Sequence, residues 1–115
     1  MAGLILRTIL KITTGDTAAI KAIAEKWVAA TRNEEGVVGF HGFMELGDGR
    51  FMFLEHYRDS EAFMIHRDLV DPALRSELYT LAKFESLEVY GDPSSAVQAA
   101  LAPAGAVIFN HIVSR

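Results

Sequence analysis

Hydrophobic and polar residues follow two periods along this chain, and each change of period marks the boundary of a predicted element. Stretches rich in Ile, Val, Phe and Leu, bounded by Gly, Asp and Pro, have the composition of β-strands. Between them, apolar residues recur every three or four positions, which is the period of an amphipathic helix. The predicted strands span residues 4–12, 37–46, 50–58, 84–90 and 106–113.

The first predicted helix starts at Asp16, whose carboxylate suits both the free N–H groups and the positive end of a helix. Its polar side carries Lys21, Glu25 and Lys26. The opposite side is an apolar stripe, as expected of a helix that packs on a core. The residues of this stripe are Ile20, Ile23, Ala24, Trp27 and Thr31.

Two further helices are predicted after the third strand. Asp59 or Ser60 caps a short one, which places Phe63 and His66 on its apolar side. Asp71-Pro72 starts the next, because a capping Asp followed by Pro is typical of a helix beginning. Its buried side is predicted to hold Leu74, Leu78 and Leu81, and a weak fourth helix covers residues 94–101.

A hairpin is predicted between the second and third strands, with Gly47-Asp48-Gly49 as its turn. Around a three-residue turn, the register pairs residues whose numbers add up to 96. Glu55 then lies opposite His41, and Tyr57 lies opposite Gly39. We therefore expect Glu55 and His41 to share one face of the sheet.

Both faces of this hairpin are apolar at their centres. Phe51 and Phe53 lie on one face, while Met52 and Leu54 lie on the other. A sheet with helices on one side and water on the other would have one polar face. The second apolar face therefore predicts a partner, and a second copy of the same sheet related by a two-fold axis satisfies it.

The order of elements is β-α-β-β-α-β, with an extra strand at the C-terminal end. This order predicts an α+β, ferredoxin-like fold in a single domain over residues 1–115. The extra strand is free to lie along the sheet edge of a partner subunit, which would remove an exposed edge.

The composition of the chain argues against several classes of function and partner. A formal net charge of −4 argues against a nucleic-acid partner, which would favour a basic surface. No apolar run approaches the roughly 20 residues of a spanning helix, and no signal peptide is recognisable at the start, so no membrane partner is expected. The chain has no cysteine, which fits a reducing cytoplasm and excludes thiolate chemistry.

Neither a metal nor an organic cofactor is expected. The four histidines show none of the spacings that bind zinc, and the glycines form no phosphate-binding loop. No nucleophile elbow of the G-x-S-x-G type is present.

The segment from Arg50 to His66, with Glu34-Glu35-Gly36-Val37-Val38 upstream, resembles the antibiotic biosynthesis monooxygenase family. The resemblance implies a dimeric α+β barrel in which a histidine recurs at the place of His66. Its oxygenases deprotonate an electron-rich phenol, quinol or polycyclic aromatic substrate, whose anion itself reduces dioxygen without metal or flavin. Its haem-degrading branch is disfavoured, because Thr8, His66 and Ser76 occupy the places of that branch's Asn, Trp and His.

The candidate site combines polar residues with aromatic walls. The proposed catalytic residues are His66, Tyr57 and His41. The proposed substrate-binding residues are Arg7, Trp27, Phe53, Glu55 and Phe63. Each has a structural alternative: an ion pair between Glu55 and His41, a pairing of Arg7 with a Glu, and a core role for the aromatic residues and His66.

Three functions fit this inventory. The first is a cofactor-independent monooxygenase acting on a small aromatic substrate. The second is a non-catalytic homodimer that binds a small apolar ligand. The third is an isomerase or decarboxylase on the same barrel, in which His66 moves a proton and oxygen is not used.

Overall fold

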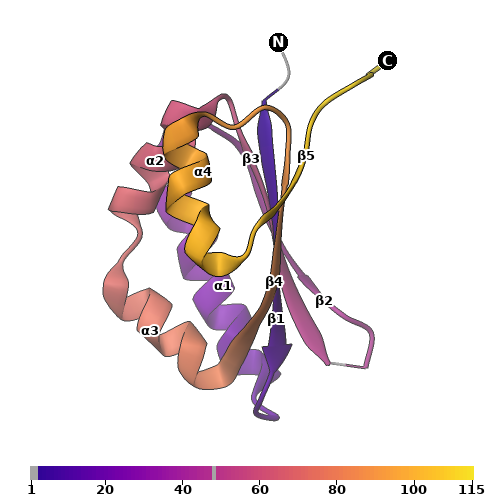
Figure 1. Cartoon of the computed structure of the whole chain (residues 1–115). Coiled ribbons are helices and arrows are strands. Elements are labelled where there is room, and N and C mark those ends of the chain that lie inside the picture. The colour runs from indigo at the N-terminus through magenta and orange to yellow at the C-terminus, as the bar shows by residue number, and fades with distance from the viewer. Residues whose placement is uncertain (1–2, 48) are drawn as a thin grey trace.

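A computed structural model describes residues 3–47 and 49–115 of the chain. One five-stranded sheet carries four helices (Figure 1). The strands are β1 (Leu4–Ile12), β2 (Val37–Met44), β3 (Arg50–Tyr57), β4 (Ala82–Tyr90) and β5 (Val107–Phe109). The helices are α1 (Thr17–Thr31), α2 (Ser60–Leu69), α3 (Pro72–Leu81) and α4 (Ser95–Leu101), with a 3-10 turn, η1 (Ala102–Ala104), after α4.

The strands lie in the order β2-β3-β1-β4-β5. The pairs β2–β3, β3–β1 and β1–β4 are antiparallel, and β5 joins the edge of β4 in parallel. The first four strands and the helices between them have the ferredoxin-like arrangement. The predicted α+β fold class is therefore confirmed.

The helices begin where their capping residues predict. Asp16 accepts a hydrogen bond from the backbone N–H of Ala19 at 3.0 Å, and Asp59 accepts one from Ala62 at 2.9 Å. Asp71 accepts from the N–H of the residue after Pro72 at 2.9 Å. Each carboxylate satisfies a donor that the first helical turn leaves without an intrahelical partner.

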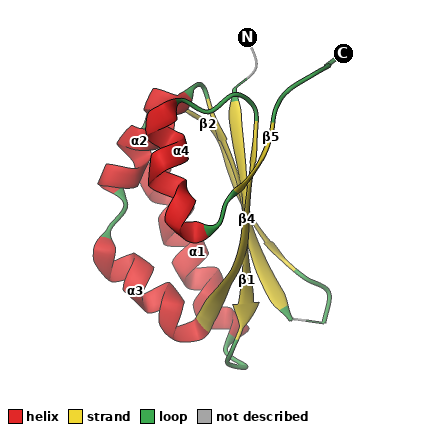
Figure 2. Cartoon of the chain, in the orientation of Figure 1, coloured by secondary structure: helices red, strands yellow, loops and turns green. Residues whose placement is uncertain are grey.

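All the helices cover the same face of the sheet (Figure 2). The core lies between these layers, and the predicted stripe of α1 contributes Ile20, Ile23 and Trp27 to it. From β3, the alternate residues Phe51, Phe53, Glu55 and Tyr57 point into the same layer. Met52 and Leu54 consequently lie on the other face, which none of the helices in the described residues covers.

The β2–β3 register differs by one residue from the prediction. The backbone N–H of Glu45 bonds the carbonyl of Arg50 at 2.9 Å, so four residues lie between this pair, whereas the predicted register places three between residues 46 and 50. Asp48 of the predicted turn lies outside the described residues, and Gly47 has a φ of 96°. Phe40, not His41, is the partner of Glu55.

The C-terminal strand also differs from its prediction. It is shorter than residues 106–113, and it lies beside β4 of its own chain. Gly105 adopts a φ of 68° after η1, which reverses the chain towards β4. Asn110 then ends the strand, because its side-chain amide donates to the Gly91 carbonyl at 3.2 Å.

Candidate functional site

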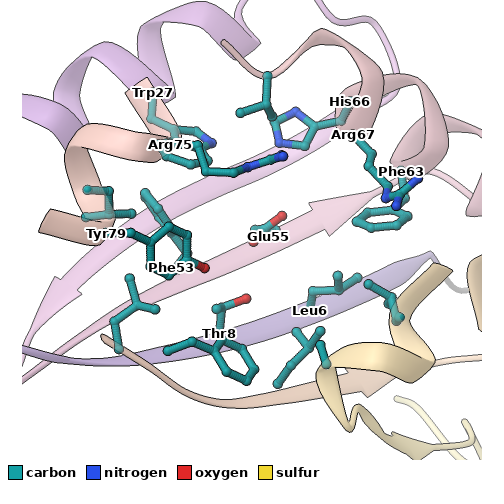
Figure 3. Close-up of a pocket in the computed structure, with 17 residues that line it drawn as sticks. Leu6, Thr8, Trp27, Phe53, Glu55, Phe63, His66, Arg67, Arg75 and Tyr79 are labelled. Atoms are coloured by element: carbon teal, nitrogen blue, oxygen red, sulfur yellow. The ribbon is translucent and has the colours of Figure 1, made fainter. Parts of the chain in front are cut away.

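A cavity of about 340 Å³ opens between the helices and the sheet. Its floor includes Thr8, Phe53 and Glu55, and its helical side includes Trp27 and His66. Figure 3 shows the Glu55 carboxyl in the middle of this group, with the aromatic rings around it. The cavity therefore has apolar walls and a single carboxyl on its floor, an arrangement typical of small-molecule sites.

Glu55 is a carboxyl inside the core. It exposes 8% of its surface, and it accepts a hydrogen bond from the hydroxyl of Tyr57, two residues along the same strand. Burial raises the pKa of Glu55 to about 7, although hydrogen bonds from Tyr57 and Thr8 oppose the rise. Near neutrality the carboxyl is thus present in both protonation states, as an acid–base catalyst requires.

Tyr57 is a donor to Glu55 and not an ionised base. Burial is the main cause that raises its pKa, and the neighbouring Glu55 adds to this effect. The phenol is fully buried and therefore stays protonated. Its hydroxyl holds the Glu55 carboxyl in place.

His66 forms a second polar pair with Glu34. Its Nδ1 lies 2.9 Å from Glu34 Oε1, and both side chains are almost completely buried. Burial lowers the pKa of His66, while Glu34 opposes this change. A carboxylate that accepts the proton of Nδ1 orients the ring and leaves Nε2 as the free nitrogen.

The walls of the cavity are aromatic. The Trp27 and Phe53 rings lie 5.1 Å apart, and Phe40, which does not line the cavity, packs 5.2 Å from both Phe53 and His66. Trp27 Nε1 is buried without a hydrogen-bond partner among the described residues. An orphaned donor is energetically unfavourable in a core.

Two arginines and a tyrosine occupy the exposed part of the cavity lining. Arg67 extends from α2, whereas Arg75 and Tyr79 extend from α3. All three are exposed to solvent. Figure 3 shows Arg75 beside His66 on the helical side of the cavity.

Most of the predicted site residues come together in this structure. Phe53, Glu55, Phe63, Trp27 and His66 line the cavity, and Tyr57 reaches it through its bond to Glu55. Local patterns placed these side chains on the inward faces of their elements.

Arg7 and His41 lie on the opposite face of the sheet, so the structure does not bring them together with the other predicted site residues in this cavity. Successive strand residues point to opposite faces, and Leu6 and Thr8 line the cavity on either side of Arg7. Arg7 instead binds Glu88 at 2.5 Å. His41 is exposed and pairs with Leu54, because a shift of one residue turns a side chain to the other face.

Local sequence patterns do not indicate the remaining residues of the site. Glu34 meets His66 across 32 positions, a distance that no local spacing reveals. Arg67 follows His66 directly, and Arg75 lies one residue after the predicted stripe position Leu74. The inward position of Thr8 follows from the alternation of side chains along β1, once the inward face of β1 is known.

The sequence matches the family described as antibiotic biosynthesis monooxygenase over residues 4–71, more than half of the chain. The chain therefore belongs to the antibiotic biosynthesis monooxygenase family. Curated protein sequences gave no significant match.

Solved structures share the fold. MupZ from Pseudomonas fluorescens superposes with a TM-score of 0.87 at 20% identity, over 100% of this chain and 96% of its own. SnoaB from Streptomyces nogalater, a cofactor-independent oxygenase, gives 0.66 at 16% identity, over 83% and 97% of the two chains. Rv0793 from Mycobacterium tuberculosis gives 0.67 at 18% identity, over 83% and 99%.

Two further observations concern the described residues alone. None of their helices is long and apolar enough to cross a membrane. No three of their His, Asp and Glu side chains are placed to share a metal ion.

Proposed function

We propose that this chain is a cofactor-independent monooxygenase that acts on a small phenolic or quinol-type aromatic molecule in the cavity below α1, α2 and α3. The observation that carries this proposal is the buried Glu55 carboxyl, poised near neutral pH on the floor of an aromatic cavity. Membership of the family and the fold shared with a cofactor-independent oxygenase support it.

In the proposed reaction, the Glu55 carboxylate takes the proton of the substrate's phenol. The Trp27 and Phe53 rings, 5.1 Å apart, form an apolar wall against which the aromatic body of this anion would lie. The electron-rich anion then reduces dioxygen. One oxygen atom of dioxygen bonds to a ring C–H carbon, so that this carbon and the phenol carbon become the two carbonyls of a quinone. The other oxygen atom leaves as water with the ring hydrogen and the phenol hydrogen, so the reaction consumes no external reductant.

His66 is the second acid–base group of the proposal. Glu34 holds its Nδ1, so Nε2 is the nitrogen available to the cavity. Because its pKa is lowered, the ring is neutral at neutral pH and acts as an acceptor. In this proposal His66 Nε2 passes the proton of the ring C–H carbon to the hydroxide that leaves as water.

The size of the cavity agrees with a small substrate. Its 340 Å³ falls within the roughly 300–1,000 Å³ of typical ligand pockets. The apolar rings of the wall match an aromatic body, and the few polar groups match one or two oxygen substituents.

Oxygen consumption tests the proposal. A panel of quinols and related phenols is incubated with the protein at neutral pH in the presence of a chelator, and uptake is followed with an electrode. Glu55→Gln should lower uptake by about 10²-fold or more, the usual contribution of a general base. The exposed Glu25→Gln is the matched control and should leave uptake unchanged.

A second function uses the same two groups without oxygen. Glu55 and His66, the two acid–base groups that line the cavity, also suit an isomerase or decarboxylase in which His66 moves a proton. Turnover that depends on Glu55 and proceeds under nitrogen would favour this alternative. Tight binding of the panel without any turnover would instead favour a ligand-binding protein.

We also propose that the chain forms a homodimer through the uncovered face of the sheet. Phe51 and Phe53 are buried under the helices, so the face that carries Met52 and Leu54 is the one available to a partner. Phe43 and Phe109 are each 48% exposed within the chain, and Tyr90 stacks on Phe109 at 5.5 Å. This apolar surface matches a second copy of itself.

Sedimentation tests the homodimer. Phe109→Glu should convert a species of twice 12.6 kDa into one of 12.6 kDa, because it places a carboxylate in the proposed apolar interface of each copy. Ala29→Glu, on the exposed side of α1, is the control and should leave the dimer intact. A wild-type protein of 12.6 kDa at micromolar concentration would refute the proposal.

A further inference from the structure

We propose that the ligand of this cavity is an aromatic acid, which binds with its anionic group at Arg67 and Arg75 and its phenolic end at Glu55. The inference rests on the proposed function, because it assigns a substrate class to the same cavity. It starts from the unequal distribution of charge along the cavity, with cations in its exposed lining and a carboxyl on its floor.

The two arginines are free to bind an anion. Among the described residues, Arg7, Arg50 and Arg58 each form an ion pair with a carboxylate, whereas Arg67 and Arg75 form none. A guanidinium without a carboxylate partner is an effective donor to a carboxylate ligand, because it can form two parallel hydrogen bonds.

Among the described residues, neither arginine forms an ion pair with the Glu55 carboxyl on the floor of the cavity. The pKa of Glu55 is shifted by burial and by hydrogen bonds from Tyr57 and Thr8, with no contribution from an arginine. Arg75 instead acts on His66 and Tyr79 on the helical side. Arg67 and Arg75 reach the cavity from α2 and α3, whereas Glu55 reaches it from β3, so a ligand between the helices and the sheet can meet both kinds of group.

General attraction of anions does not explain this arrangement. The chain carries a net charge of −4, so its overall field opposes an anionic ligand. Two unpaired arginines over one apolar cavity therefore indicate that the cavity itself favours an anionic ligand. The Trp27 ring lines the same cavity and offers an apolar surface to the aromatic body of this ligand.

Trp27 also supplies the readout, because it is the only tryptophan of the chain. Its indole N–H gives one signal in the heteronuclear NMR spectrum of nitrogen-labelled protein. A ligand that enters the cavity shifts this signal, so the titration reports on the cavity and not on the rest of the surface.

The experiment titrates the protein with 6-hydroxynaphthalene-2-carboxylate and with the corresponding neutral amide. These two probes share a shape and a phenol, and they differ in the charge of one group. Arg67→Gln, Arg75→Gln and the double variant are compared with wild type. Arg32→Gln, an exposed arginine at the end of α1 that does not line the cavity, is the matched control.

We expect the carboxylate to bind about tenfold more tightly than the amide, since each exposed ion pair is worth up to about 1 kcal/mol. Each single variant should lose about threefold in affinity for the carboxylate and nothing for the amide, and the double variant should bind both probes equally. Arg32→Gln should match wild type. Moderate salt should weaken the binding of the carboxylate probe and leave the binding of the amide unchanged.

Two results would overturn the inference in distinguishable ways. If both probes shift the Trp27 signal with equal affinity in wild type and in the arginine variants, the cavity binds aromatic molecules without preference for an acid. The proposed function then stands while the substrate class fails. If neither probe shifts the signal, the cavity admits no aromatic ligand, and both fail.

Discussion

Replacing Glu55 by Gln should change how the stability of this protein depends on pH. The buried carboxyl has a pKa raised from 4.5 to about 7, so the folded protein holds a proton that the unfolded chain has released between these values. Stability is therefore fully present below about pH 4.5 and falls as the pH rises to about 7. Since each pKa unit is worth about 1.4 kcal/mol, the loss amounts to about 3 kcal/mol.

Glu55→Gln removes this loss while it keeps an oxygen that can accept the hydroxyl of Tyr57. The difference in unfolding free energy between variant and wild type should therefore move by about 3 kcal/mol in favour of the variant from pH 4.5 to pH 8. The difference is the relevant quantity, because His66 contributes with the opposite sign. Its lowered pKa means that stability rises with pH up to about 6.5 in both proteins.

Urea unfolding at fixed protein concentration, followed by the fluorescence of Trp27, measures these free energies. The exposed Glu25→Gln is the control, and its curve should run parallel to that of wild type. Parallel curves for Glu55→Gln and wild type across the whole range would refute the reasoning, because they would mean that Glu55 ionises in the folded protein as easily as in the unfolded chain.

Two further variants probe the polar pairs of the cavity. Tyr57→Phe removes a hydrogen bond that lowers the pKa of Glu55, so the stability loss should move to higher pH, with about 1 kcal/mol lost overall; an unmoved pH profile would contradict this. Glu34→Gln removes the group that raises the pKa of His66, so the imidazole signals should titrate at lower pH than in wild type. An unchanged titration would show that the pair does not form.

Much of the fold could be predicted because it is encoded in short stretches of sequence. The bounds of β1 agree with the predicted residues 4–12, and the capping Asp16, Asp59 and Asp71 mark the helix starts. These signals are local: a carboxylate that bonds an N–H two or three residues away needs no tertiary contact. The inward position of His66 follows from the same helical period.

The predictions fail where a shift of one residue changes which side chains of a whole strand point to which face of the sheet. The loop before Arg50 is one residue longer than predicted, and that single residue turns His41 away from Glu55. The face of the sheet on which Arg7 lies depends on which side of β1 the helices cover. The sequence of β1 alone does not determine that side. The pairing of Glu34 with His66 is a tertiary contact, and only the folded chain reveals it.

The central claim is that the cavity around Glu55 oxidises an aromatic substrate with dioxygen and no cofactor. The most direct test supplies isotope-labelled dioxygen to the protein and an active quinol in ordinary water, under conditions where Glu55→Gln gives no product. Mass spectrometry should find one labelled oxygen atom in the product and the other in water. Product formed without label, or formed equally well without dioxygen, would contradict the claim and assign the cavity to proton transfer alone.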